Sequence, residues 1–355
     1  MTWLVTSLPP ALRNGWALTF GNGIEMPTRT PSTVLYDRPH RQLRRFDRDT
    51  PATGNPVLLV PPLAVDASCY DLRPGQSLAQ FLLDTGRQPY VIDYGRITAA
   101  DRDLGLEEWI DDIVPTAVAR ISAEHGGADV DVIGWSLGGI ISLLTAADHA
   151  ELPLASVTTL GSPLDFGKNI LLKPVRMFAK FTGGREISYT THLFGGIPGY
   201  FVQAGFRGMS LSRELTRPLF IARNAGDTEA LARMEAIDRF IDAMPGYPGR
   251  LYRQTYRQLI VGNQLARGRV RLSAGRDIDL TKLSCRVLLL GSNGDTLAPS
   301  ATIAPGVDIL SGAAEVEFAD VPGLNHLALI AGPQARTTTW PLIDDFLTRQ
   351  PPRPV

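Results

Sequence analysis

The residues best suited to chemistry lie in a Gly-x-Ser-x-Gly stretch, residues 134–138, with Ser136 at its centre. An apolar run typical of a strand enters this stretch, and an apolar run typical of a helix leaves it. A sharp turn between a strand and a helix exposes a serine hydroxyl as a nucleophile, and glycines let neighbouring backbone pass close to the turn. The free N–H groups of the following helix favour a developing oxyanion. This context favours nucleophilic catalysis by Ser136 over an ordinary glycine-rich turn.

A serine nucleophile needs a general base, and two histidines follow Ser136 at a useful distance, His192 and His326. His326 comes after the alternating run 315–319 and a Pro-Gly turn, so it is expected just beyond the end of a strand. No strand-like run precedes His192, which is expected in an irregular segment with a surface or lid role. The pattern therefore predicts His326 as the base.

The acid that orients such a histidine is predicted to be Asp295. It follows the apolar run 286–291, which is typical of a strand buried on both faces, and so lies at the carboxyl edge of the sheet. There it would hold the tautomer of the imidazole and stabilise the imidazolium. Taken alone, Asp295 could equally be a turn former before a helix. The order Ser136, Asp295, His326, each at a strand end, favours a catalytic triad.

Two backbone N–H groups are predicted to bind the oxyanion. One belongs to Leu137, the residue after the nucleophile. The other is expected from the loop after the strand 56–61, where Pro61 and Pro62 have no N–H and Leu63 is the first possible donor. Ala64 is the alternative.

Composition limits the other classes of function. The 355 residues carry a formal net charge of −1, which gives no electrostatic case for nucleic acid, and 44% of them are hydrophobic, as in a soluble globular protein. Cys69 and Cys285 lack metal-ligand spacing, so we expect structural thiols and neither a metal nor a resident cofactor. No basic leader or membrane-length apolar run is visible, and a cytoplasmic location is expected. The arginines within 38–48 are interpreted as a solvated face rather than a phosphate or membrane contact.

Strands and helices that alternate along the chain predict an α/β fold. After an opening hairpin at 34–46, strand-like runs occur at 56–61, 89–93, 129–134 and 155–160. Helical patterns at 76–85, 106–123 and 137–148 separate these runs. This alternation predicts βαβ units and a mostly parallel sheet. We expect an N-terminal extension at 1–30, core at 31–163, a helical cap at 164–283 with its clearest helices at 229–243 and 247–266, and core again at 284–350, closing with a helix at 335–348.

The predicted cap is rich in apolar and aromatic side chains. They could form the core of the cap itself, or some of them could line an acyl pocket above Ser136. The set comprises Phe178, Phe181, Phe194, Tyr200, Phe201, Phe206, Met209 and Phe220.

Further segments resemble the polyhydroxyalkanoate synthase family of α/β-hydrolases and its esterase-like relatives, and the similarity spans residues 30–348. The similar stretches read Pro61-Pro62-Leu63, Tyr70-Asp71-Leu72-Arg73-Pro74-Gly75-Gln76-Ser77-Leu78, Val91-Ile92-Asp93-Tyr94-Gly95, Leu160-Gly161-Ser162-Pro163-Leu164-Asp165-Phe166, Gly246-Tyr247-Pro248-Gly249, Tyr256-Arg257-Gln258, Gly262-Asn263-Gln264-Leu265 and the segment 291–299.

This resemblance implies an α/β-hydrolase fold and a covalent acyl-enzyme formed from 3-hydroxyacyl coenzyme A thioesters. Coenzyme A would then be part of a substrate rather than a cofactor, and association with a lipid or polymer surface is implied as well. Two positions depart from the family. The synthases carry cysteine where this chain has Ser136, and their Gly-His-Ile-Gly reads Asn325-His326-Leu327-Ala328 here.

The serine decides between the functions that remain open. A thiolate exchanges readily with a thioester, whereas a serine depends on its histidine and forms an oxyester that is handed to water or an alcohol. We therefore expect a serine esterase or lipase that acts on hydrophobic carboxylic esters such as acylglycerols. The alternatives are acyl transfer from coenzyme A thioesters and a catalytically silent, granule-associated binding module, which the intact triad disfavours.

Overall fold

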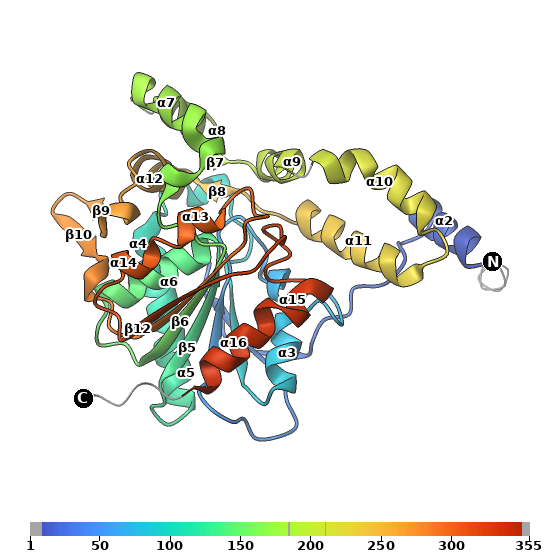
Figure 1. Cartoon of the computed structure of the whole chain (residues 1–355), viewed down its shortest axis with the longest axis horizontal. Helices are drawn as coiled ribbons and strands as arrows, with labels where there is room; N and C mark the ends of the chain where they lie inside the picture. The colour runs from blue at the N-terminus through green and yellow to red at the C-terminus, as the bar shows by residue number, and fades with distance from the viewer. Residues whose placement is uncertain (1–8, 184, 210, 350–355) are drawn as a thin grey trace.

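An eight-stranded sheet organises the molecule, of which the computed structural model describes residues 9–183, 185–209 and 211–349 (Figure 1). Within this sheet the strands at residues 32–36, 42–46 and 89–93 pair antiparallel, and all the other neighbouring strands pair parallel. This arrangement confirms the predicted α/β class with a mostly parallel sheet. In spatial order the strands are β1 (Ser32–Tyr36), β2 (Gln42–Phe46), β4 (Pro89–Asp93), β3 (Val57–Val60), β5 (Val130–Trp135), β6 (Leu154–Leu160), β11 (Arg286–Gly291) and β12 (Glu315–Asp320).

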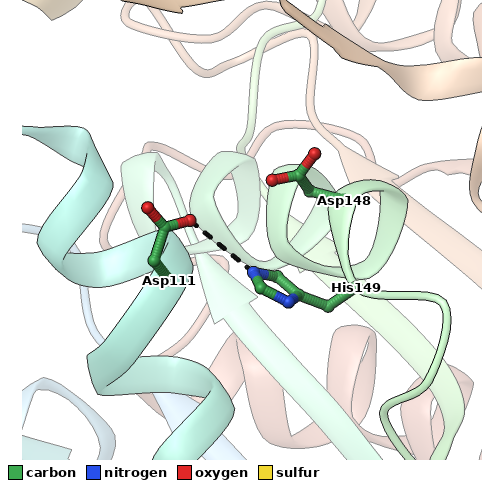
Figure 2. Close-up of side chains that lie close together, drawn as sticks. All are labelled: Asp111, Asp148 and His149. Carbon is green, nitrogen blue, oxygen red and sulfur yellow. Dashed lines mark ion pairs between the residues drawn. The ribbon is translucent and has the colours of Figure 1, made fainter. Parts of the chain in front are cut away.

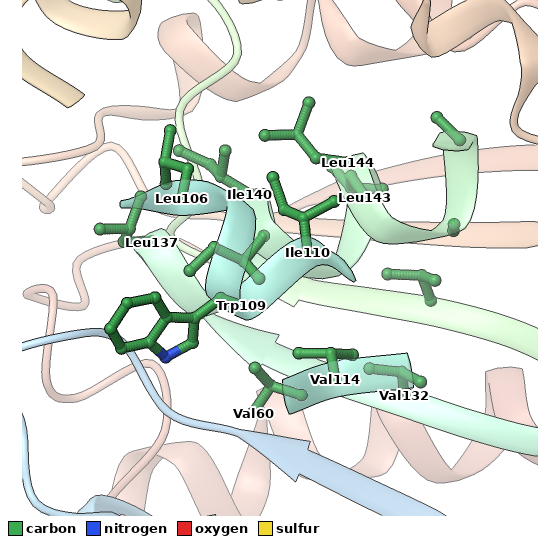
Figure 3. Close-up of a cluster of buried hydrophobic side chains, with 14 of the residues drawn as sticks. Val60, Leu106, Trp109, Ile110, Val114, Val132, Leu137, Ile140, Leu143 and Leu144 are labelled. Atoms are coloured by element: carbon green, nitrogen blue, oxygen red, sulfur yellow. The ribbon is translucent and has the colours of Figure 1, made fainter. Parts of the chain in front are cut away.

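Helices cover both faces of this sheet, so β3, β5 and β11 are buried along their whole length. The two faces of the sheet belong to two separate buried clusters, as alternate residues of β3 show. Leu58 packs in the cluster under α6 (Leu137–Asp148), and Leu59 packs in the cluster under α3 (Leu78–Asp84) and α16 (Thr339–Thr348). Figure 3 shows Trp109, Ile140 and their neighbours in the first cluster. The covering helices are α3 (Leu78–Asp84), α4 (Leu106–Glu108), a π-helical turn Trp109–Ile113, α5 (Val114–Glu124), α6 (Leu137–Asp148), α13 (Ser300–Ile303), α14 (Gly306–Ile309), α15 (Pro333–Thr337) and α16 (Thr339–Thr348).

The long segment between β6 and β11 is mostly helical, and in Figure 1 much of it projects beyond the carboxyl ends of the strands. His192 lies within helix α8, so the expectation of an irregular segment there was wrong. The elements are α7 (Lys173–Thr182), α8 (Arg185–Phe194), β7 (Gly196–Ile197), α9 (Gly199–Met209), α10 (Leu211–Arg223), α11 (Thr228–Asp242), β8 (Tyr247–Pro248), α12 (Gly249–Gln254), a π-helical stretch Thr255–Val261, β9 (Arg269–Ser273) and β10 (Arg276–Asp279).

The last part of this segment packs against α6, one of the helices that cover the sheet, rather than on the projecting helices. The hairpin of β9 and β10 sends Val270, Leu272 and Ile278 into the same buried cluster as the residues of α6. The division of the chain into core and cap at 164–283 stays a prediction, but residues 269–283 share their buried contacts with the core.

The N-terminal extension contains helix α2 (Pro10–Phe20), which lies beside α10 and α11 in Figure 1. The Asn14 amide donates to the carbonyl of Ala225 at 2.9 Å, and the Ile24 N–H donates to Glu235 at 2.7 Å. From residue 9 on, where the structure describes it, the extension is therefore attached to the helical insertion and adds no strand to the sheet.

Carboxylates pair with several arginines of the 38–48 run. Arg41 pairs with Asp112, and Arg45 approaches Glu124 at 2.5 Å. Among the residues that the structure describes, no helix combines the length and apolar character that a membrane span requires.

Candidate active site

Ser136 occupies a strained turn between β5 and α6, with φ 54° and ψ −122°. A positive φ is uncommon for a residue with a side chain, so the surrounding packing must hold it. A methyl group on Gly138 would lie 2.2 Å from the Val60 carbonyl oxygen, and one on Gly134 would lie 2.5 Å from the Cα of Gly139. The glycines of the motif are thus required by close backbone contact, and Ser136 is left partly exposed among buried neighbours.

Tyr70, in the loop that follows β3, holds this turn against the next strand. Its hydroxyl donates to the Val60 carbonyl at 2.8 Å and accepts the Trp135 N–H at 2.9 Å. Burial raises the pKa of the Tyr70 phenol well above its ordinary value, so the group stays a neutral donor and acceptor. The sequence showed Tyr70 only as part of a family motif, and nothing in its spacing indicated this contact.

His326 and Asp295 form a buried pair at the carboxyl edge of the sheet. The Nδ1 atom of His326 lies 2.6 Å from Oδ2 of Asp295. The other oxygen of Asp295 accepts the N–H groups of Leu297 at 2.8 Å and Ala298 at 3.0 Å, which fixes the carboxylate plane. A proton on Nδ1 shared with the carboxylate leaves Nε2 as the free basic nitrogen of the imidazole.

Two loops bring this pair together, and Ser292 joins them. The Ser292 hydroxyl accepts the N–H of Gly294 at 3.2 Å and of Leu324 at 2.9 Å, and it is fully buried. A methyl group on Gly294 would lie 2.8 Å from the carbonyl carbon of Gly323. The loops after β11 and β12 are therefore packed as one unit, and the residue preceding Asp295 must be small.

Trp135 connects the histidine to the serine turn, because it immediately precedes Ser136. Its indole N–H donates to the His326 carbonyl at 3.1 Å, and the two rings lie 5.1 Å apart. The indole also contacts Phe240 of α11, with ring centroids 6.4 Å apart. The structure therefore places Ser136, Asp295 and His326 at one edge of the sheet, in the chain order that the sequence analysis used.

Gly161, at the end of β6, lies directly against the pair. Its φ is +59°, and a methyl group there would lie 2.9 Å from Cε1 of His326 and 3.2 Å from Oδ2 of Asp295. Sequence reasoning noted Gly161 within a motif and gave it no role. Its position could have indicated a role in the site, because Gly161 directly follows a buried strand at the carboxyl edge of the sheet, where the other site residues lie.

The predicted oxyanion donors lie on both sides of the serine turn. Leu137 begins α6, and Leu63 lies in the turn after β3, where Ala64 has φ 59°. No acceptor among the described residues takes the backbone N–H of Leu63 or Ala64. The hydroxyl of Tyr94 donates to the Pro61 carbonyl at 3.0 Å and anchors this turn. The assignment of Leu63 stays a prediction.

Neither cysteine is suited to replace Ser136 as a nucleophile. Burial raises the pKa of the Cys69 thiol well above its ordinary value and raises that of Cys285 to about 12, so both stay protonated near neutral pH. Cys285 also precedes β11 and therefore lies at the opposite edge of the sheet from His326. Ser136 is the candidate nucleophile that remains.

One group of side chains in the described part of the chain has a spacing that could suit a metal, namely Asp111, Asp148 and His149 (Figure 2). Sequence analysis had indicated no such cluster. The Nε2 atom of His149 lies 3.6 Å from Asp111. The Arg276 guanidinium pairs with Asp148 and also donates to Asp111 at 2.6 Å. The arginine supplies the cation that these carboxylates need, so the group is an ion-pair network. It lies at the far end of α6 from Ser136.

Comparison with known proteins adds a family match to this geometry. Residues 57–337 match the family model described as "Alpha/beta hydrolase family". The chain is also similar to poly(3-hydroxyalkanoate) polymerase subunits PhaC. That of Allochromatium vinosum is 24% identical over 90% of this chain and 89% of its own length. That of Synechocystis sp. is 26% identical over 90% and 85%. That of Haloferax mediterranei is 23% identical over 91% of this chain, which spans 64% of that relative.

Solved structures agree on the fold. A putative lipase from Sulfolobus solfataricus superposes with a TM-score of 0.50 at 13% identity, covering 90% of this chain and 99% of the other. An N-acyl homoserine lactone degrading enzyme gives a TM-score of 0.50 at 13% identity over 89% and 100%. Together with the family match, which covers most of the chain, the comparisons show that this protein belongs to the alpha/beta hydrolase family, is polyhydroxyalkanoate synthase-like within it, and is an enzyme of the esterase/lipase or acyltransferase kind.

Proposed function

We propose that the protein is a serine hydrolase that cleaves hydrophobic carboxylic esters through an acyl-enzyme on Ser136. The observation that carries the proposal is the buried His326–Asp295 pair, with its 2.6 Å contact, held by Trp135 next to the strained Ser136 turn. A strained turn costs stability, and such strain is usually kept where chemistry uses it.

In the proposed reaction, Oγ of Ser136 attacks the ester carbonyl while Nε2 of His326 takes the hydroxyl proton. Asp295 holds Nδ1 and stabilises the imidazolium, and the N–H groups of Leu137 and Leu63 bind the oxyanion. The C–O bond to the leaving alcohol then breaks, and the alcohol departs with the proton from His326. Water repeats the sequence on the acyl-enzyme and releases the acid.

The surroundings of the pair support an apolar acyl group. Trp135, Leu160 and Phe240 belong to one buried hydrophobic cluster beside His326. These side chains are themselves buried, so they keep water from the inner side of the pair, and such surroundings favour an uncharged substrate beside it.

A series of p-nitrophenyl esters from acetate to octanoate tests the proposal, with Ser136→Ala as the variant. We expect kcat/KM to rise with chain length, and the variant to lose at least about 10³-fold. A fluorophosphonate should add its mass to Ser136 in the wild type and not in the variant. Circular dichroism checks that the variant folds. Unchanged turnover in the variant would remove Ser136 from the mechanism, and a wild type that takes no label would indicate a silent binding module.

A second candidate is acyl transfer from 3-hydroxyacyl coenzyme A, which the PhaC relatives favour because two of them align over more than four-fifths of their own length. Here the thioester C–S bond breaks, an oxyester to Ser136 forms, and the thiol leaves with the proton from His326. The acyl group then passes to a hydroxyl. Thiol release with 3-hydroxybutyryl coenzyme A, followed by mass analysis of the product, separates oligomer from free acid.

A further inference from the structure

Helix α7 turns its apolar side to solvent. Met177, Phe178 and Phe181 are 65%, 58% and 92% exposed, whereas Ala179 is the residue of this helix that is buried. A surface helix normally turns its apolar stripe toward the core and its polar side outward. In α7 the large apolar side chains face outward instead, and no part of the chain that the structure describes covers them.

The same segment carries only positive charge. Residues 166–185 include five basic residues and no acidic one, and Lys173 and Lys180 are exposed on α7 itself. Among the described residues, no carboxylate pairs with either lysine. At 100° per residue the two lysines lie together on the helix, at the border of the apolar side, as in helices that lie flat on a charged interface.

The segment just before α7, which forms the base of the helix, is hydrogen-bonded to the candidate active site. The Asn169 amide donates to the carbonyl of Leu297 at 2.9 Å and to that of Thr296 at 3.3 Å, in the loop that directly follows Asp295. Ile170 and Leu171, just before α7, are exposed as well. Figure 1 shows α7 projecting on the side of the sheet where the strands have their carboxyl ends. The apolar surface and the site therefore lie on the same side of the molecule.

We propose that α7 is an interfacial helix that docks the protein on an anionic phospholipid surface. Met177, Phe178 and Phe181 enter the boundary between headgroups and acyl chains, and Lys173 and Lys180 lie at the level of the phosphates. The positive charge of Lys173 and Lys180 favours an anionic phospholipid surface over the other possible partners of this face. A second copy of the chain would bring the same positive face against this one, and an uncharged polyester surface offers the lysines no partner. The inference does not depend on the reaction proposed above.

Sedimentation of the whole chain with lipid vesicles tests the proposal. We expect the protein to bind vesicles with about one-third phosphatidylglycerol more tightly than pure phosphatidylcholine, and the difference to vanish near 0.5 M salt because ions screen surface charge. Lys180→Glu should weaken binding to the anionic vesicles by at least about fivefold. Lys282→Glu makes the same charge change at an exposed residue outside this segment and should bind like the wild type.

Phe181→Glu tests the apolar half of the surface, and Phe20→Glu is its control, because Phe20 is also exposed but lies on α2. We expect only Phe181→Glu to lose vesicle binding, with the melting temperatures of both variants unchanged. Equal binding to neutral and anionic vesicles, or no binding to either, would overturn the proposal. So would a dimer in sedimentation velocity that Phe181→Glu dissociates, because the face would then belong to a second copy.

Discussion

At the scale of single residues, some groups of the candidate site can be recognised in the sequence, whereas others can be recognised only from contacts between distant strands. Ser136, Asp295 and His326 are visible in the sequence because each follows a strand-like run and because their order is diagnostic. Tyr70 and Gly161 are not, since a tyrosine in a loop and a glycine after a strand are common in every α/β protein. Tyr70 matters because the folded chain brings its hydroxyl within 2.8 Å of the Val60 carbonyl, and Gly161 matters because His326 and Asp295 leave no room for a methyl group there.

Gly161→Ala is expected to impair catalysis without unfolding the protein. The added methyl group must displace His326 or Asp295, which it would approach at 2.9 Å and 3.2 Å. We expect kcat/KM for a soluble ester to fall by about 10- to 100-fold, since small misplacements in a site have costs of this size. Gly126→Ala is the matched control, because Gly126 has a similar φ of +67° and open space around its Cα. Both variants bear the backbone strain, and only the first should lose activity; equal losses would mean that strain alone is responsible.

Asp131 should make stability depend on pH. It is buried in β5 and accepts a hydrogen bond from Ser156 at 2.5 Å, and burial raises its pKa from 3.8 to about 6. The folded state therefore holds this proton more tightly than the unfolded state, and the carboxyl reduces stability as the pH rises from about 4 to 6. Asp131→Asn keeps an acceptor for Ser156 and should be more stable than the wild type by up to about 3 kcal/mol at pH 8.

That advantage should disappear near pH 4, where the wild-type carboxyl is also neutral. Urea unfolding of the wild type and of Asp131→Asn at pH 8 and at pH 4 measures this difference in stability. Asp129→Asn, at the exposed position two residues earlier, should show no such difference. An Asp131→Asn variant less stable than the wild type at pH 8 would show that Asp131 is charged and paired in the folded state.

At the scale of elements, sequence periodicity located the strands and the helices that cover the sheet well, and it left open which sides of the helical insertion are buried. The runs 56–61, 89–93 and 155–160 correspond to β3, β4 and β6 to within one residue at either end, because strands buried on both faces are continuous apolar segments. The helical pattern of α7 predicts an apolar side but does not say what covers it. Phe178, Phe181 and Phe220 were candidates for a cap core or an acyl pocket, and the structure leaves all three exposed.

Arg73 is expected to hold the helical insertion on the sheet. Its guanidinium donates to both oxygens of Glu229, at 2.7 Å and 2.8 Å, and lies 2.8 Å from Glu25 of the N-terminal extension. Arg73→Met should lower the free energy of unfolding by about 2 kcal/mol, the contribution of hydrogen bonds between charged groups. It should also loosen α11, whose Phe240 contacts Trp135 beside the candidate site.

Urea unfolding and limited proteolysis of the extension measure these effects. Arg233→Met is the matched control, since Arg233 approaches the same Glu229 at 3.5 Å but is more exposed to solvent. Exposed pairs contribute little, so this variant should stay near the wild type. Two variants with equal stability losses would show that the link from Arg73 to Glu25 has no special role.

At the scale of the whole molecule, the proposed active site and the proposed lipid-binding face of α7 together predict how a hydrophobic substrate would reach Ser136. Asn169 joins the base of α7 to the loop after Asp295, so a surface that binds α7 lies on the side of the sheet where the site residues are. A long-chain ester dissolved in that surface would be concentrated there, whereas a short soluble ester would not.

Two expectations for the wild type follow, and they depend on both proposals above. Anionic vesicles should raise the initial rate on a long-chain ester several-fold, because docking concentrates enzyme and substrate in one plane. The rate on p-nitrophenyl acetate should stay constant, since that ester reaches the site from water. Phe181→Glu should lose the enhancement, and Phe20→Glu should keep it. If the vesicles raise both rates, they act on the catalytic step itself, and the lipid surface opens the site rather than delivering its substrate.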